Sequence, residues 1–162
     1  MLPDYVASDL EVIFCGTAAG RRSAQFGRYY AGRGNGFWKT LYEVGLTRKQ
    51  LTPQQDSEIL EYGIGLTDLA KGMSGMDRQI PVNAYAPQRL NHLVERYRPK
   101  RIAFTSITAA RIALRDRKIS SGRLQKSPFS PVEVWALPSP SGAARGHWDI
   151  RPWEDLAKSI MG

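Results

Sequence analysis

The sequence predicts an α/β domain built on a parallel sheet that helices cover on both faces. Short apolar runs alternate along the chain with longer segments in which apolar residues recur at helical spacing. Buried parallel strands have the first pattern, and the helices that cover them have the second. The chain has 162 residues, which suits one core of ordinary size. Without internal repeats or a linker, we expect a single domain over residues 1–162.

The first expected elements are a strand and a helix separated by a polar segment. Residues 11–15 form a brief apolar run that ends at Gly16, as a buried strand does. Residues 17–36 are polar, rich in glycine and without a clear period. Residues 37–44 place large apolar side chains at helical spacing and stop at Gly45, which predicts an amphipathic helix.

The middle of the chain adds two helices and a weaker strand. Thr52 is a typical N-cap, and Pro53 suits the first position of a short helix. Residues 63–69 read as a strand that runs into a loop. Residues 90–97 repeat apolar side chains at helical spacing, and Pro99 ends that helix.

The last third continues the alternation. Residues 101–105 and 132–137 are apolar and β-rich, so we expect two further strands. Residues 109–117 and 152–161 have helical spacing. Residues 120–131 are basic and contain serine and proline, which indicates a loop.

The charge distribution favours a polyanionic partner, with nucleic acid first. Lysine and arginine total 23 against 15 acidic residues, a formal net charge of +8. Residues 96–126 alone hold ten basic residues and one acid, Asp116. Most of the excess is arginine, whose planar guanidinium binds phosphate through two hydrogen bonds. The alternative is a solvated basic surface that keeps the protein soluble.

Composition argues against a metal site. Cys15 is the only cysteine, and as the end of an apolar run it is expected to be a buried, inert thiol. His92 and His147 stand outside any ligand-spaced motif. No apolar stretch approaches the ~18 residues that cross a bilayer, and the first residues carry acids where a signal peptide carries positive charge. We therefore expect a cytoplasmic protein without a membrane partner.

Ligands of open α/β sheets bind beyond the carboxyl ends of the strands. In this chain those ends lead into residues 16–36, 67–75, 105–108 and 138–146. The first loop begins Gly-Thr-Ala-Ala-Gly, whose small side chains let the backbone approach a ligand closely. It lacks the third glycine of a dinucleotide site and the Gly-Lys-Ser/Thr of a P-loop. A nucleotide-binding α/β enzyme with a phosphate on this loop is thus a remote alternative.

Three motifs in order give a more specific indication. Residues 16–20 read Gly-Thr-Ala-Ala-Gly, residues 35–39 read Asn-Gly-Phe-Trp-Lys, and residues 137–145 read Leu-Pro-Ser-Pro-Ser-Gly-Ala-Ala-Arg. Their order and spacing resemble the uracil-DNA glycosylase superfamily, and most closely its mismatch-specific uracil/thymine branch. That branch has Gly-Ile-Asn-Pro-Gly, Asn-Arg-Phe-Trp-Lys and Leu-Pro-Asn-Pro-Ser-Gly-Leu-Ser-Arg in these places. The resemblance spans about residues 11–158.

The resemblance implies a fold, an activity and a set of site residues. The fold is a three-layer α/β/α sandwich with a short parallel central sheet. The enzyme acts as a monomer, flips uracil or another deaminated base out of DNA, and hydrolyses the N-glycosidic bond without a cofactor. Tyr30 stacks on the base, while the backbone at Thr17 and Ala18 and the amide of Asn35 face its edge. The implied DNA wedge and phosphate contacts are Ser141, Gly142, Ala143, Ala144 and Arg145.

The chain departs from the family pattern where the chemistry is done. The mismatch-specific family positions the attacking water with the asparagine of its first motif, and this chain has Ala18 there. Ser139 replaces the asparagine or histidine of the closing motif. Either the activity is relocated to other residues, or the protein binds damaged or abasic DNA without cutting it. In the wedge, Ala143 and Ala144 supply less apolar volume than the leucine and serine of the family. Arg145 would therefore have to fill more of the gap that the flipped base leaves in the stack.

If the activity is relocated, a carboxylate is the best substitute, because it accepts a proton from water and stabilises a cationic sugar. Asp68 is the candidate, since the end of the second strand is expected to lie beside the first, near Ala18. It could instead cap a loop or pair with an arginine. Ser23 and Ser139 could orient a water, and His147 could stabilise a departing uracil anion or be a plain surface histidine.

Overall fold

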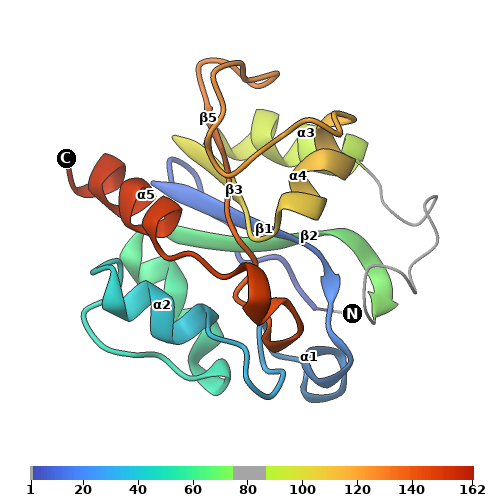
Figure 1. The fold of residues 1–162 in the computed structure, drawn as a ribbon, viewed down its shortest axis with the longest axis vertical. Helices are drawn as coiled ribbons and strands as arrows, with labels where there is room; N and C mark the ends of the chain where they lie inside the picture. Colours follow the sequence, from blue (N-terminus) through green and yellow to red (C-terminus); the bar gives the residue numbers. More distant parts are fainter. Residues whose placement is uncertain (1, 75–86) are drawn as a thin grey trace.

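The computed structural model describes residues 2–74 and 87–162, and in these residues five strands form one sheet (Figure 1). The strands are β1 (Val12–Ala19), β2 (Ile64–Ser74), β3 (Arg101–Phe104), β4 (Gly122–Arg123) and β5 (Glu133–Ala136). Their order is β2-β1-β3-β5-β4. The first four in this order are parallel, as expected, but the edge strand β4 runs antiparallel to β5.

Helices cover both faces of this sheet, which gives the expected three-layer α/β/α arrangement (Figure 1). One layer holds α2, α5 and the 3-10 helix η1, and the other holds α3 and α4. The short α1 and the 3-10 helix η4 lie at the carboxyl ends of the strands. The bounds are α1 Arg21–Phe26, α2 Phe37–Glu43, η1 Pro53–Tyr62, α3 Pro87–Tyr97, α4 Ile107–Leu114, η4 Gly142–His147 and α5 Arg151–Met161.

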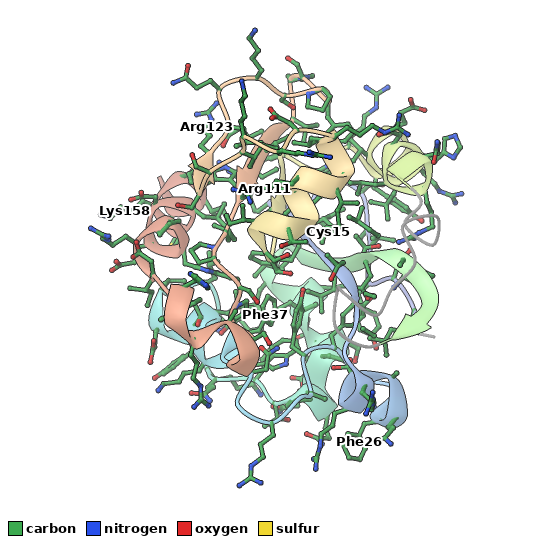
Figure 2. All side chains as sticks on the ribbon, turned by 45° about the vertical axis from the view of Figure 1, so that its right-hand side comes forward. Cys15, Phe26, Phe37, Arg111, Arg123 and Lys158 are labelled. Carbon is green, nitrogen blue, oxygen red and sulfur yellow. The ribbon has the colours of Figure 1, made fainter. Side chains whose placement is uncertain are left out.

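The two layers follow from the alternation of side chains along β1. Phe14 belongs to one core, where its ring lies 5.3 Å from Phe37 and 5.7 Å from Trp153. The next residue, Cys15, belongs to the opposite core, with side chains of α3 and α4. Cys15 and Phe37 mark the two cores in Figure 2. Cys15 is fully buried, as expected, and burial raises the pKa of its thiol.

Strands β1 and β2 run further than predicted. Instead of ending at Gly16, β1 continues to Ala19, and instead of becoming a loop after Leu69, β2 continues to Ser74. The two strands pair through Gly16 and Asp68 and again through Ala18 and Ala70. Their last residues are small or polar, because they border the site rather than a core, and so they resemble a loop in the sequence. The remaining expected loop residue, position 75, lies outside the described residues.

The expected helices are confirmed with small changes in their bounds. A capping box at Thr52 starts η1, as Thr52 and Pro53 predict, although the segment is 3-10 rather than α. Ser106 caps α4 by accepting a hydrogen bond from the backbone of Ala109. Periodicity missed α1, β4 and η4, since each is too short to show a period. Among the described residues, no helix is long and apolar enough to cross a membrane.

Candidate active site

A cleft of about 720 Å³ opens where β1, β2 and β3 reach their carboxyl ends. Its lining comes from the end of β1, from α1 and the chain that follows it, and from the loop before η4 with the first residues of η4. Residues 114–128, at the amino end of β5, line another cleft of about 670 Å³. That second cleft contains none of the candidate site residues, so the first cleft is the candidate active site. Both clefts are lined by residues in the described part of the chain.

The candidate site residues in the cleft are those at its floor and rim. They are Thr17, Ala18, Ser23, Tyr30, Asn35, Asp68, Ser139, Ser141, Gly142 and Ala144. His147 is exposed at the end of η4 and does not line the cleft. Ala143 belongs to η4, but its side chain lies outside the described part.

Asp68 is a buried carboxylate at the floor of this cleft. Its side chain emerges from β2 beside Gly16 of β1, and the residue is 4% exposed. A methyl group on Gly16 would lie only 2.8 Å from Asp68 Oδ1, so glycine leaves the room that the carboxylate occupies. Burial raises the pKa of Asp68 to about 6, although the nearby Lys71 cation favours the ionised form. A carboxyl with this pKa can exchange a proton near neutral pH.

An internal ion network surrounds Asp68. Lys71 Nζ lies 3.6 Å from Asp68 Oδ2 and 3.1 Å from Asp4 Oδ1, and it donates a hydrogen bond of 2.8 Å to the hydroxyl of Tyr29. The side chain of Lys71 is 13% exposed, so the solvent screens these contacts only in part. The side-chain partner of Asp68 is therefore Lys71 from the same strand, and not an arginine, which was the alternative.

Arg89 of α3 ties the network to the backbone. Its guanidinium lies 2.6 Å from Asp4 Oδ2, donates 2.8 Å to Thr67 Oγ1, and donates to the carbonyl of Asp68. Sequence reasoning missed Asp4, Lys71 and Arg89. Asp4 and Arg89 come from segments far from Asp68 in the chain, while Lys71 lies three residues after Asp68, in a segment expected to be a loop.

Tyr30 forms an aromatic wall of the cleft. Its ring stacks on Phe37 at 3.9 Å between centroids and 19° between planes. Its hydroxyl lies 3.1 Å from Thr105 Oγ1, and burial holds the pKa of that hydroxyl well above its usual range. The backbone at Tyr30 has φ 51°, a left-handed conformation that is uncommon outside glycine. The ring is therefore held in one place by stacking, by a hydrogen bond and by the turn that presents it.

Three polar candidates brace the backbone of the cleft. Ser23 Oγ accepts a hydrogen bond of 2.8 Å from the amide of Ala31, and Asn35 Oδ1 accepts one of 2.9 Å from the amide of Phe37. Ser139 Oγ accepts one of 3.2 Å from the amide of Ser141. Each of these three oxygens therefore accepts a hydrogen bond from the backbone of the cleft.

The end of β1 points backbone groups into the cleft. Within a strand, alternate residues direct their peptide groups to the same edge. The carbonyl of Cys15 accepts from the amide of Thr105, just beyond the end of β3. By this alternation, we expect the peptide groups of Thr17 to be directed to the same edge, where β3 has ended and the cleft begins. The family resemblance implies that the base lies at this edge.

Two loops meet at the rim of the cleft opposite Asp68. The amide of Gly36 donates 2.8 Å to the carbonyl of Pro140, and a methyl group on Gly142 would lie 3.4 Å from the carbonyl of Gly34. The guanidinium of Arg145 crosses the same glycine, since a methyl group on Gly34 would lie 2.7 Å from its Nη2. The loop implied as a DNA wedge is therefore packed against the loop that carries Asn35.

The basic residues divide into internal and exposed ones. Arg101, from the basic stretch 96–126, is buried and pairs with Glu11 and Glu133. Arg28 pairs with the buried Asp56. Other arginines and lysines of that stretch are exposed, as Figure 2 shows for Arg111 and Arg123. The structure describes no cluster of three or more histidine, cysteine or acidic side chains that could hold a metal ion, within residues 2–74 and 87–162.

A solved structure has the same fold. The solution NMR structure of a protein described as a "putative Uracil DNA glycosylase" from Methanosarcina acetivorans matches with a TM-score of 0.70 at 20% sequence identity. The match covers 99% of this chain and 97% of that chain. At this identity, the likeness shows the three-layer fold alone.

The family follows from the sequence itself. The model of the "Uracil DNA glycosylase superfamily" matches residues 3–157, which includes every candidate site residue. This match supports a role as a DNA glycosylase, a hydrolase of DNA repair. The chain belongs to the uracil DNA glycosylase superfamily.

Proposed function

We propose that this protein is a monomeric, monofunctional uracil-DNA glycosylase, related to the mismatch-specific branch, in which Asp68 activates the attacking water. The observation that carries the proposal is the buried carboxylate at the floor of the cleft, whose pKa of about 6 suits a base near neutral pH. The cleft has the position and lining that a flipped base requires. Uracil is the expected base, and other deaminated bases are further candidates.

The base would enter between Tyr30 and the end of β1. Tyr30 offers an aromatic face for stacking, and Phe37 supports its ring from behind. The peptide groups at Thr17 and Ala18 and the amide of Asn35 would read the edge of the base. Ser141, Gly142, Ala144 and Arg145 would face the gap left in the duplex, together with Ala143.

Hydrolysis requires one bond to break and one to form. The C1′–N bond of the nucleotide breaks, its electron pair leaves with the base, and the sugar carbon becomes cationic. Water adds its oxygen to C1′, and the Asp68 carboxylate accepts the proton that the water loses. That proton then neutralises the base anion. The products are the free base and an abasic sugar, and Asp68 returns to its ionised form.

Exposed basic side chains would attract the DNA without reading it. Residues 96–126 supply most of the excess positive charge, less the internally paired Arg101. Contacts of this kind act on phosphates and weaken steeply with salt. We therefore expect affinity for undamaged DNA to fall as the salt concentration rises.

A single assay tests the proposal against its alternatives. Protein is incubated with labelled duplex and single-stranded oligonucleotides that contain one uracil, hypoxanthine or xanthine, and abasic products are then cleaved with alkali. We expect a product band from the uracil oligonucleotide. Binding to abasic DNA without any product band would instead identify a non-catalytic binder. Saturable binding of free nucleotide, with indifference to DNA, would identify a nucleotide-binding enzyme.

Replacing Tyr30 by alanine should weaken capture of the base. Loss of one base–aromatic stack costs roughly 1 to 3 kcal/mol, so the observed affinity for uracil-containing DNA should fall by about 5- to 150-fold. Tyr30→Phe should retain most of it, because the ring remains. Single-turnover rates measured over a range of enzyme concentrations give this affinity.

Tyr42→Ala is the matched control, because Tyr42 is an exposed tyrosine on α2 outside the cleft. Equal effects of Tyr30→Ala and Tyr42→Ala would contradict the stacking role of Tyr30.

A further inference from the structure

The carboxylate of Asp4 and the ammonium of Lys71 form a partly buried pair that the mechanism above does not use. Asp4 stands in the N-terminal segment, which meets the outer edge of β2 through a bridge between Tyr5 and Leu66. This bridge brings Asp4 beside the end of the strand that carries both Asp68 and Lys71. The pair therefore depends on the fold, and not on proximity in the sequence.

Lys71 lies where the regular pairing of β2 with β1 breaks. Ala70 pairs with Ala18, but the next paired residue, Ala19, lies opposite Ser74. Lys71 thus belongs to an unpaired bulge of β2, and bulges commonly redirect side chains beside active sites. Its ammonium spans Asp4 Oδ1 at 3.1 Å and Asp68 Oδ2 at 3.6 Å.

We propose that Lys71, held in place by Asp4, is a positioning residue that keeps the carboxylate of Asp68 ionised and turned toward the cleft. This inference rests on the proposed role of Asp68 as the base. Lys71 contacts Oδ2, while Oδ1 lies over Gly16 at the floor of the cleft. One oxygen is anchored and the other faces the water to be activated.

Electrostatics explains why such an anchor is needed. A carboxylate buried without a partner takes up a proton, and it then cannot act as a base at neutral pH. Lys71 and Arg89 both favour the ionised form of Asp68, whereas Asp4 opposes it. The hydroxyls of Tyr29 and Tyr30 and the thiol of Cys15 also face this group, and burial raises the pKa of each, so they stay neutral.

The negative charge of Asp4, which holds Lys71, also disfavours the ionised form of Asp68. Arg89 offsets this effect, because it pairs with Asp4 at 2.6 Å and donates to the backbone carbonyl of Asp68. The network thus contains two acidic side chains, Asp4 and Asp68, and two basic ones, Lys71 and Arg89, so their formal charges cancel. The arrangement lets Asp4 fix Lys71 without adding net negative charge beside the base.

The test is the pH profile of single-turnover excision by the full chain. Replacing Lys71 by methionine, which has a similar length and no charge, should move the acid limb of the profile upward by about one pH unit or more. The rate should recover in part at high pH, because alkali ionises Asp68 without Lys71, and the remaining deficit measures the loss of the anchor on Oδ2. Lys71→Arg should leave the limb near its original position.

Asp4→Asn supplies a second, opposite prediction. Asparagine keeps an oxygen that can accept a hydrogen bond from Lys71, so the anchor remains. It removes the negative charge of Asp4, which raises the pKa of Asp68, so the acid limb should move downward. Lys39→Gln is the surface control, since Lys39 is exposed on α2 and its salt bridge in the described part of the chain is with Glu43. The acid limb of this variant should not move. A Lys71→Met limb at the wild-type pH, with the rate lowered equally at all pH values, would overturn the proposal.

A direct titration separates this inference from the proposed function. The carboxyl carbon signal of Asp68, followed by NMR against pH, reports its pKa in the absence of any substrate. A higher pKa in Lys71→Met than in the wild type supports the electrostatic role, even if no base is excised. An unchanged pKa overturns it. Absence of excision by the wild-type protein would overturn the proposed function alone.

Discussion

Replacing Asp68 by asparagine should lower the single-turnover rate of uracil excision by about 10²- to 10⁴-fold. Asparagine fills nearly the same space but cannot accept the proton of the attacking water. Affinity for uracil-containing DNA should stay within a few-fold of the wild type, because Asp68 acts on the reacting bond and not on phosphates. The measurement uses enzyme in excess over a labelled oligonucleotide, so that product release does not limit the rate.

The same variant should fold at least as well as the wild type at neutral pH. The folded-state pKa of Asp68, about 6, exceeds its ordinary value of 3.8, so the folded protein binds more protons between these values. The contribution of this group to the free energy of unfolding therefore falls as the pH rises through that window. Asparagine does not ionise, so the variant avoids this fall in the free energy of unfolding. Comparing the thermal unfolding midpoints of the variant and the wild type at pH 8 checks this expectation. A wild-type excision rate in Asp68→Asn would move the role of base to Ser23 or Ser139, which line the cleft, and not to His147, which lies outside it.

Replacing Gly16 by alanine should also cause a large loss of activity. The added methyl group would lie 2.8 Å from Asp68 Oδ1 and 3.4 Å from Thr105 Oγ1, so the carboxylate must shift. A misplacement of about 1 Å in a reacting group can cost 10²-fold in rate, and we expect a loss of about that size. Single-turnover excision at saturating enzyme measures it.

Gly20→Ala is the matched control for Gly16→Ala. A methyl group on Gly20 has no atom within 4 Å, and the φ of Gly20, −63°, suits any residue. Its rate should remain that of the wild type. Full activity in Gly16→Ala would show that the position of the Asp68 carboxylate does not matter, contrary to the mechanism.

The core of the fold could be predicted because periodicity reflects burial. In β1, Phe14 and Cys15 face opposite cores, and in α5 the apolar face carries Trp153 and Leu156. Periodicity failed where the residues serve the cleft. The ends of β1 and β2 have small or polar side chains, so residues 16–19 and 70–74 resembled loops although they continue the sheet.

The site was predictable only in the parts that a motif carries. Tyr30 and Asn35 were placed by the order of motifs, and both line the cleft. Asp68 was placed by the expected neighbourhood of two strands, and its pairing with Gly16 confirms that neighbourhood. Asp4 and Arg89 could not be found, because the contacts that bring them to Asp68 join segments far apart in the chain.

The most direct test of Asp68 as the base is the pH dependence of single-turnover uracil excision by the wild type and by Asp68→Asn. The wild-type rate should fall as the pH drops through about 6, because protonation of Asp68 removes the base. The residual rate of Asp68→Asn should lack that limb. An acid limb that persists unchanged in Asp68→Asn would assign it to another group and contradict the mechanism.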